Sequence, residues 1–243
     1  MKQNNNFQNI AIIGDTGAIG AAIVKRCQTL FPEAYICGFS SQATNDLSVD
    51  HFQIDYADEN TIEQAAQDAA HDKKFDLVFV ATGILHDEDG LAPEKSLRDL
   101  SYEKFEKVFA ANTIFPALAA KHFIPHLNKN GRSVFSALSA RVGSISDNHL
   151  GGWYSYRASK SALNMIIRNA AIEVGRRHKE AIIVGLHPGT VDSSLSKPFQ
   201  SNVKEEKLFS PDYSAERLLS VIDNLKAEDS GKCFAWDGEE IPA

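Results

Sequence analysis

Long apolar runs and clustered cysteines are both missing from this sequence. No apolar run approaches the roughly 20 residues that cross a bilayer, and residues 1–8 are polar, without the apolar core of a signal peptide. The three cysteines, Cys27, Cys37 and Cys233, are widely spaced, which favours free thiols in a reducing compartment over disulfides. We therefore expect a soluble cytoplasmic protein with no membrane partner and no metal site.

A basic stretch is also lacking. The formal net charge is −7, the sequence pI is about 5.6, and charged residues of both signs are mixed along the chain. This pattern argues against a nucleic-acid partner. A chain of 243 residues can bury a sizeable core, and single α/β domains of this size are common. One domain over residues 1–243 is therefore expected.

Short apolar runs alternate with helical patterns along the chain. Strands are expected at residues 10–13, 34–39, 51–55, 75–80, 131–137, 181–186 and 232–236. Helices are expected at residues 21–30, 61–70, 102–127, 153–178 and 211–227. The alternation predicts an α/β fold of Rossmann type, a doubly wound, seven-stranded parallel sheet with helices on both faces. Residues 86–98 are expected to form a surface excursion, and residues 194–209 a mobile lid.

Tyr156 and Lys160 lie one helical turn apart in the expected helix at residues 153–178, so they share a face. An ammonium beside a phenol favours the phenolate, and we expect it to lower the pKa of Tyr156 toward neutrality. The alternative is a buried tyrosine with a lysine that passes it on the way to solvent. The small residues around the pair favour the first interpretation, because they leave room for a ligand.

A glycine-rich turn follows the first expected strand at residues 14–20. Gly14, Gly17 and Gly20 would allow backbone to approach a diphosphate, and the helix that follows would direct its first N–H groups at those oxygens. A tight strand-to-helix turn without a ligand explains the same pattern.

The helix motif Tyr156-Arg157-Ala158-Ser159-Lys160 resembles the Tyr-x-Ala-Ser-Lys active-site helix of the short-chain dehydrogenases/reductases. Residues 138–145 and 151–153 more narrowly resemble the C-factor and sniffer-type carbonyl reductase branch. The resemblance covers nearly the whole chain. The turn departs from the family pattern at Ile13 and Ala18, and residues 80 and 81 replace two family asparagines.

The resemblance implies a catalytic set of Asn112, Ser139, Tyr156 and Lys160. It implies that Asp55 contacts adenine, that Gly83 allows the ribose to approach, and that the segment after residue 187 meets the nicotinamide carboxamide. The full set of expected cofactor contacts is Gly14, Thr16, Gly17, Ala18, Ile19, Gly20, Ser40, Asp55, Gly83, Pro188, Gly189, Val191 and Ser193.

The end of the second expected strand bears on the choice of cofactor. Ser40 and Ser41 stand where an acid would bind the ribose 2′-hydroxyl of NAD, and no arginine or lysine marks NADP. Without that acid, the two serines and nearby N–H groups could bind a 2′-phosphate. NADP(H) is therefore the preferred expectation, and NAD(H) remains open. Asp15 would favour NAD(H) if its side chain points inward.

These features predict an NAD(P)H-dependent oxidoreductase that reduces an aldehyde or ketone to an alcohol, with Tyr156 as proton donor. A cofactor-binding regulatory protein of C-factor type and an epimerase or dehydratase are the alternatives. The resemblance also implies a homodimer or homotetramer that pairs the helices around residues 110–120 and 158–171. The sequence does not identify the substrate.

Pro116 interrupts the long helical pattern at residues 102–127. Proline has no N–H to bond the carbonyl of Asn112, four residues earlier, and its ring pushes that carbonyl away. We expect a kinked helix with a free Asn112 carbonyl.

Overall fold

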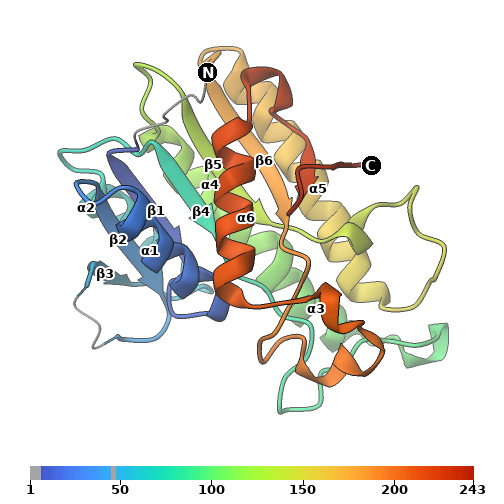
Figure 1. Ribbon diagram of the computed structural model, residues 1–243. Coiled ribbons are helices and arrows are strands. Elements are labelled where there is room, and N and C mark those ends of the chain that lie inside the picture. The colour runs from blue at the N-terminus through green and yellow to red at the C-terminus, as the bar shows by residue number, and fades with distance from the viewer. Residues whose placement is uncertain (1–6, 45–47) are drawn as a thin grey trace.

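The computed structural model describes residues 7–44 and 48–243, in which a main sheet lies between two layers of helices (Figure 1). The strand order is β10-β9-β6-β5-β4-β1-β2-β3. These strands are β1 (Asn9–Ile13), β2 (Tyr35–Ser40), β3 (Asp50–Gln53), β4 (Leu77–Val80), β5 (Ser133–Leu138), β6 (Ala181–His187), β9 (Cys233–Ala235) and β10 (Glu240–Ile241).

The seven predicted strands are all present and run parallel to one another, which confirms the predicted fold class. The strand count was wrong by one, because β10 adds an eighth strand that pairs antiparallel with β9. A tight turn with Gly238 at φ 89° reverses the chain between them. β10 has only two residues, which is too short to produce a periodic pattern in the sequence.

Alternate residues of each strand face two separate cores. Ile10 and Ile12 pack with α1 (Ala18–Leu30) and α6 (Pro211–Asn224), which lie in front of the sheet in Figure 1. Ala11 and Ile13 face the other core, formed with α2 (Glu59–Ala69), α4 (Phe115–Phe123) and α5 (Tyr154–Gly175). Burying a large apolar side chain contributes about 1.5–3 kcal/mol, so both faces stabilise the sheet that carries the site.

The predicted helix at residues 102–127 is divided. It consists of α3 (Tyr102–Phe109), a π-helical turn labelled η2 (Ala110–Ile114), α4 and a short 3₁₀ turn labelled η3 (Ile124–His126). The Phe115 N–H bonds the Ala110 carbonyl, five residues back. The position of the interruption was predicted from Pro116. Its form was not, because a π turn precedes Pro116 and accommodates the missing N–H.

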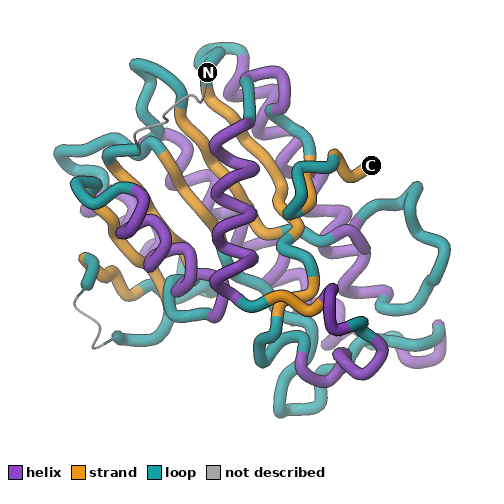
Figure 2. Tube along the Cα trace, in the orientation of Figure 1, coloured by secondary structure: helices purple, strands orange, loops and turns teal. Residues whose placement is uncertain are grey.

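The expected mobile lid is folded instead. Residues 197–202 form the 3₁₀ helix η5 (Lys197–Asn202), followed by η6 (Glu205–Lys207) and by β8 (Leu208–Phe209), which pairs with β7 (Thr190–Val191). Figure 2 shows these short elements gathered with other loops at one end of the sheet. The excursion at residues 86–98 is also anchored, because Leu91 and Glu94 are buried.

Candidate active site and cofactor site

The predicted catalytic residues come from three elements that meet at the carboxyl ends of the parallel strands. Ser139 directly follows β5, Tyr156 and Lys160 lie in the first two turns of α5, and Asn112 lies in the π turn. Ser139, Tyr156 and Lys160 line one cavity of about 480 Å³, which also reaches Gly83. Asn112 is fully buried, and its Oδ1 lies against Gly83. The structure therefore brings all four residues to one place.

Lys160 lies beside Tyr156 as the spacing predicts, with Nζ 5.8 Å from the centre of the phenol ring. Its ammonium donates to the Leu138 carbonyl at 2.8 Å. Burial raises the pKa of Tyr156 to about 12 and lowers the pKa of Lys160 to about 8. The expected lowering of the Tyr156 pKa is therefore wrong, because desolvation of the buried phenol sets the direction of the shift. The neutral phenol is the form that can donate a proton.

The Ser139 hydroxyl donates to Asn164 Oδ1 at 2.6 Å, and the Cys233 thiol donates to the same oxygen at 3.1 Å. Asn164 lies one turn beyond Lys160 on α5. It fixes the rotamer of Ser139 at the edge of the cavity. The sequence prediction did not include Asn164, because its partners come from β5 and β9, far away along the chain.

The Asn112 side chain links the π turn to two other segments. Its Oδ1 accepts from the Ile84 N–H at 2.8 Å, and its Nδ2 donates to the Ile84 carbonyl at 2.9 Å and to Ser159 Oγ at 3.2 Å. This side chain therefore holds the segment after β4 against the catalytic helix, beneath Gly83.

The glycine-rich turn passes close to the backbone around it. Gly14 has φ 86°, and a Cβ on Gly20 would lie 2.0 Å from the Gly14 carbonyl oxygen. Neither position accepts a side chain. Gly17 is the N-cap of α1 and has no side chain to cap the first N–H groups. Gly17, Ala18 and Ile19 then line the cavity that continues to Lys160.

This arrangement fits a dinucleotide. The first helix N–H groups after the N-cap, those of Ala18 and Ile19, suit a diphosphate, and Gly83 leaves space above Lys160 for a ribose. Pro188 and Ser193 line the same cavity, and Gly189 and Val191 line the one beside it. Thr82, which the sequence prediction missed, also lines the cavity, and its buried Oγ1 has no hydrogen-bond partner.

Gly14 and Gly20 shape the glycine-rich turn but line neither cavity, and three further predicted cofactor residues lie elsewhere. Ser40 is buried, and its hydroxyl donates to the Gln42 carbonyl at 3.0 Å and lies 2.9 Å from His51 Nε2. Asp55 is exposed, and its carboxylate accepts from the Ala57 N–H in a turn before α2. Thr16 is exposed in the turn before α1. None of the three lines either cavity.

The Asp15 carboxylate does point inward. It lies against Gly38, where a Cβ would be 2.0 Å from Oδ2, and Oδ1 is 3.6 Å from His51 Nε2. Burial raises the pKa of Asp15, and His51 opposes that rise.

A second cavity of about 240 Å³ adjoins the first. Ile19, Ser139, Tyr156, Pro188 and Ser193 line both. Its outer wall is aromatic, because Phe199 of η5 packs against Trp153 at 5.2 Å and against His86 at 5.6 Å between ring centres. These contacts explain why the segment expected to be a mobile lid is folded over the site.

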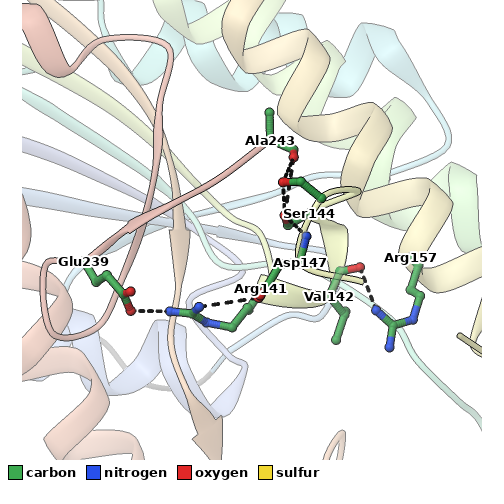
Figure 3. Close-up of polar contacts among 8 residues, drawn as sticks. Arg141, Val142, Ser144, Asp147, Arg157, Glu239 and Ala243 are labelled. Carbon is green, nitrogen blue, oxygen red and sulfur yellow. Dashed lines mark hydrogen bonds and ion pairs between the residues drawn. The ribbon is translucent and has the colours of Figure 1, made fainter. Parts of the chain in front are cut away.

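Charged contacts hold the loop beside this cavity (Figure 3). The Arg141 guanidinium pairs with Asp147 at 3.5 Å and with Glu239. Arg157 donates to the Val142 carbonyl at 3.3 Å, and the Ser144 hydroxyl lies 3.5 Å from the Ala243 carbonyl oxygen. The C-terminal residues therefore brace the segment that follows Ser139.

In the part of the chain that the structure describes, no three His, Cys, Asp or Glu side chains are grouped so that they could hold a metal ion. No helix in the same residues is both long and apolar enough to cross a bilayer.

Comparison with known proteins identifies one matching family model and several related proteins. The family model for short chain dehydrogenases matches residues 8–204. A 1-hydroxy-2-glutathionyl-2-methyl-3-butene dehydrogenase from Rhodococcus is 32% identical over 187 residues, which is 76% of each chain. The C-signal protein of Myxococcus xanthus is 33% identical over 147 residues, covering 60% of this chain and 83% of that protein.

Two solved structures share the fold. The NADPH-bound carbonyl reductase from chicken fatty liver has a TM-score of 0.83 at 22% identity, with 97% of this chain and 99% of that chain covered. The carbonyl reductase Sniffer of D. melanogaster has a TM-score of 0.80 at 19% identity, with the same coverage.

Proposed function

The chain belongs to the short-chain dehydrogenase family and is an NAD(P)-dependent oxidoreductase, and from that premise we propose that it reduces an aldehyde or ketone to the alcohol. One observation carries the proposal. Tyr156 and Ser139 line both the cavity that fits a dinucleotide and the smaller cavity beside it. A carbonyl group at the boundary would meet a proton donor and a hydroxyl where the two cavities join.

The chemistry then divides between cofactor and protein. A nicotinamide cofactor, when bound, would supply the hydride for the carbonyl carbon. The Tyr156 phenol donates its proton to the carbonyl oxygen, which completes the alcohol and leaves a phenolate. Ser139 turns its hydroxyl from Asn164 to the same oxygen and stabilises the negative charge that develops there.

Lys160 supplies the positive charge for this step. Its ammonium lies 5.8 Å from the centre of the Tyr156 ring, so it stabilises the phenolate that proton donation leaves behind. Lys160 also lies 3.4 Å from the position of a Cβ on Gly83, at the place where a ribose would bind. One side chain thus serves both the proton donor and the cofactor.

NADPH is the proposed cofactor. β2 ends without an acid, and three solved structures of this fold are described with NADPH or NADP bound. The inward Asp15 carboxylate is the one feature that favours NADH. Dissociation constants for the two reduced cofactors test the choice, and tighter binding of NADH would overturn it.

The reaction is tested with Tyr156→Phe, which removes only the phenol hydroxyl. We expect turnover of aldehydes to fall by orders of magnitude while the dissociation constant of the cofactor stays within a few-fold. A variant that retains most of the activity would overturn the role of Tyr156.

If the wild-type protein binds cofactor tightly but oxidises none across a broad panel of aldehydes and ketones, a cofactor-binding regulatory protein becomes the better interpretation. Product formed without net cofactor oxidation would instead indicate an epimerase or dehydratase.

A further inference from the structure

The smaller cavity has a distinctive wall. Apart from the residues that it shares with the cofactor cavity, the side chains lining it are mostly apolar, among them Leu85, Val142, Trp153, Phe199 and Val203. Arg141 is the only lysine, arginine, aspartate or glutamate among its lining residues. Because Asp147 and Glu239 both pair with Arg141, no unpaired cation faces the cavity.

His187 is the polar exception. It is the last residue of β6, and the Ser139 N–H bonds the carbonyl of the preceding residue, Leu186, at 2.8 Å. The parallel register pairs Leu138 with Leu186, so the next residues, Ser139 and His187, end adjacent strands. Side chains at such positions are about 4.8 Å apart along the hydrogen-bonding direction of a sheet. His187 therefore lines the cavity next to the proposed carbonyl site.

Within the described residues, the hydrogen-bonding capacity of the imidazole is unused. The buried Nδ1 has no partner, and no hydrogen bond among the described residues involves the His187 side chain. Burial, with a smaller contribution from the neighbouring Arg141 and with Asp237 opposing the shift, lowers the pKa of His187 to about 4. The ring is thus neutral at physiological pH. A buried polar group without a partner is rare in native proteins and indicates a ligand or water at that place.

On the basis of the proposed reductase function, we propose that His187 determines substrate specificity by hydrogen-bonding an uncharged polar substituent close to the reacting carbonyl. The substrate class is a compact, largely apolar aldehyde or ketone that carries one such hydrogen-bonding group. A carboxylate in the same position would be desolvated without a free cation to pair with, so anionic analogues bind poorly. His187 is a specificity residue, because the proton and the hydride pass through other groups.

Matched aromatic aldehydes test this assignment. The probes are benzaldehyde, its three hydroxy isomers and 3-carboxybenzaldehyde, each reduced by the full-length protein with its preferred cofactor. The readout is the ratio of kcat/KM for the best hydroxy isomer to kcat/KM for benzaldehyde. We expect His187→Leu to lower this ratio about tenfold, the effect of one lost hydrogen bond. His187→Asn, which keeps a polar amide, should keep the ratio within about threefold of the wild-type value.

His71→Leu is the matched control, because His71 is exposed and pairs only with Asp72 at 2.9 Å. It should leave the ratio unchanged. Should His187→Leu fail to fold, His187→Phe replaces it. A ratio unaffected by either apolar variant, or a wild-type protein that reduces 3-carboxybenzaldehyde as well as the best hydroxy isomer, overturns the role of His187 alone. A wild-type protein that reduces none of the aldehydes overturns the reductase function as well.

Discussion

Burial sets the protonation of the two central side chains, Tyr156 and Lys160. It keeps the phenol neutral and makes the ammonium easy to deprotonate, since both charged forms lose their hydration. For a reductase this state is productive, because the donor must hold its proton until the substrate oxygen becomes basic. The charge on Lys160 is then the quantity that varies with pH in the neutral range.

The pH dependence of the reduction rate should therefore follow the protonation of Lys160. With a pKa of about 8, Lys160 is an ammonium below that pH and a neutral amine above it. Because the ammonium stabilises the phenolate left on Tyr156, we expect kcat for reduction to be level below pH 8 and to fall as the pH rises through that value. Steady-state rates at saturating cofactor and aldehyde measure the profile. Lys160→Arg keeps its charge and should lose the decline, whereas an unchanged decline would assign it to another group.

Residue chemistry was predictable from the sequence only where it depends on spacing. The Tyr156 and Lys160 pair is such a case, because four residues make one helical turn wherever the helix lies. The direction of the Tyr156 pKa shift was not predictable, because it depends on burial by segments far away in the chain. His187 and Asn164 were missed for the same reason, since their roles come from neighbouring strands.

The start of α5 depends on another element for its cap. Its N-cap is Trp153, whose φ of 51° is strained for a bulky residue and whose side chain makes no capping bond. Glu94, in the segment before α3, replaces that cap. Its carbonyl accepts from the Trp153 N–H, and its carboxylate accepts from the Ser155 N–H at 3.1 Å. Tyr156 follows directly, so Glu94 sets the position of the proton donor.

Glu94→Ala should destabilise the protein by about 1–2 kcal/mol, because it removes a helix cap and a favourable charge at the helix N-terminus. Turnover should fall as well, since the first turn of α5 carries Tyr156. Urea unfolding and steady-state kinetics measure the two effects. Lys95→Ala is the control, because Lys95 is exposed next to Glu94 and lines neither cavity. Equal stability of the two variants would show that the Glu94 contact contributes nothing to α5.

Elements with a long periodic pattern were predicted well, and short ones were not. The strand β1 is a continuous apolar run and the helix α5 has a long helical pattern, so both were predicted to within a few residues. β7, β8 and β10 have two residues each, and pairing partners alone define them. The fold of residues 194–209 depends on Phe199 meeting Trp153, a contact that no local pattern encodes.

For the whole molecule, the alternation of strands and helices was sufficient to predict a doubly wound parallel sheet. Each helix serves as the crossover that connects two parallel strands, and the helices cover both faces. The cavities were beyond prediction. Their walls combine the turn after β1, the segment after β4, the ends of β5 and β6, and α5. A functional site of this kind exists only after the chain has closed around it.

The outer surface of α5 bears on assembly, which we expect to be a homodimer or homotetramer. Met165 and Ile172 are seven residues apart on α5, and so lie on one face two turns apart. They are 61% and 48% exposed, and Ile114 of the adjoining π turn is 54% exposed. In a two-fold interface both copies contribute the same surface, so each of these side chains is buried in each of the two copies. Partial burial of apolar side chains in this way contributes about 1 kcal/mol apiece.

Ile172→Glu should therefore convert the assembly to monomers, because it would place a carboxylate from each copy in an apolar interface. Sedimentation velocity at micromolar concentration measures the change, and the wild-type protein should sediment as a dimer or tetramer. Leu30→Glu is the matched control. Leu30 is 45% exposed at the end of α1, on the opposite face of the sheet, so its substitution should leave the assembly intact. A wild-type protein that sediments as a stable monomer would rule out the interface, and dissociation of both variants alike would place the contact elsewhere.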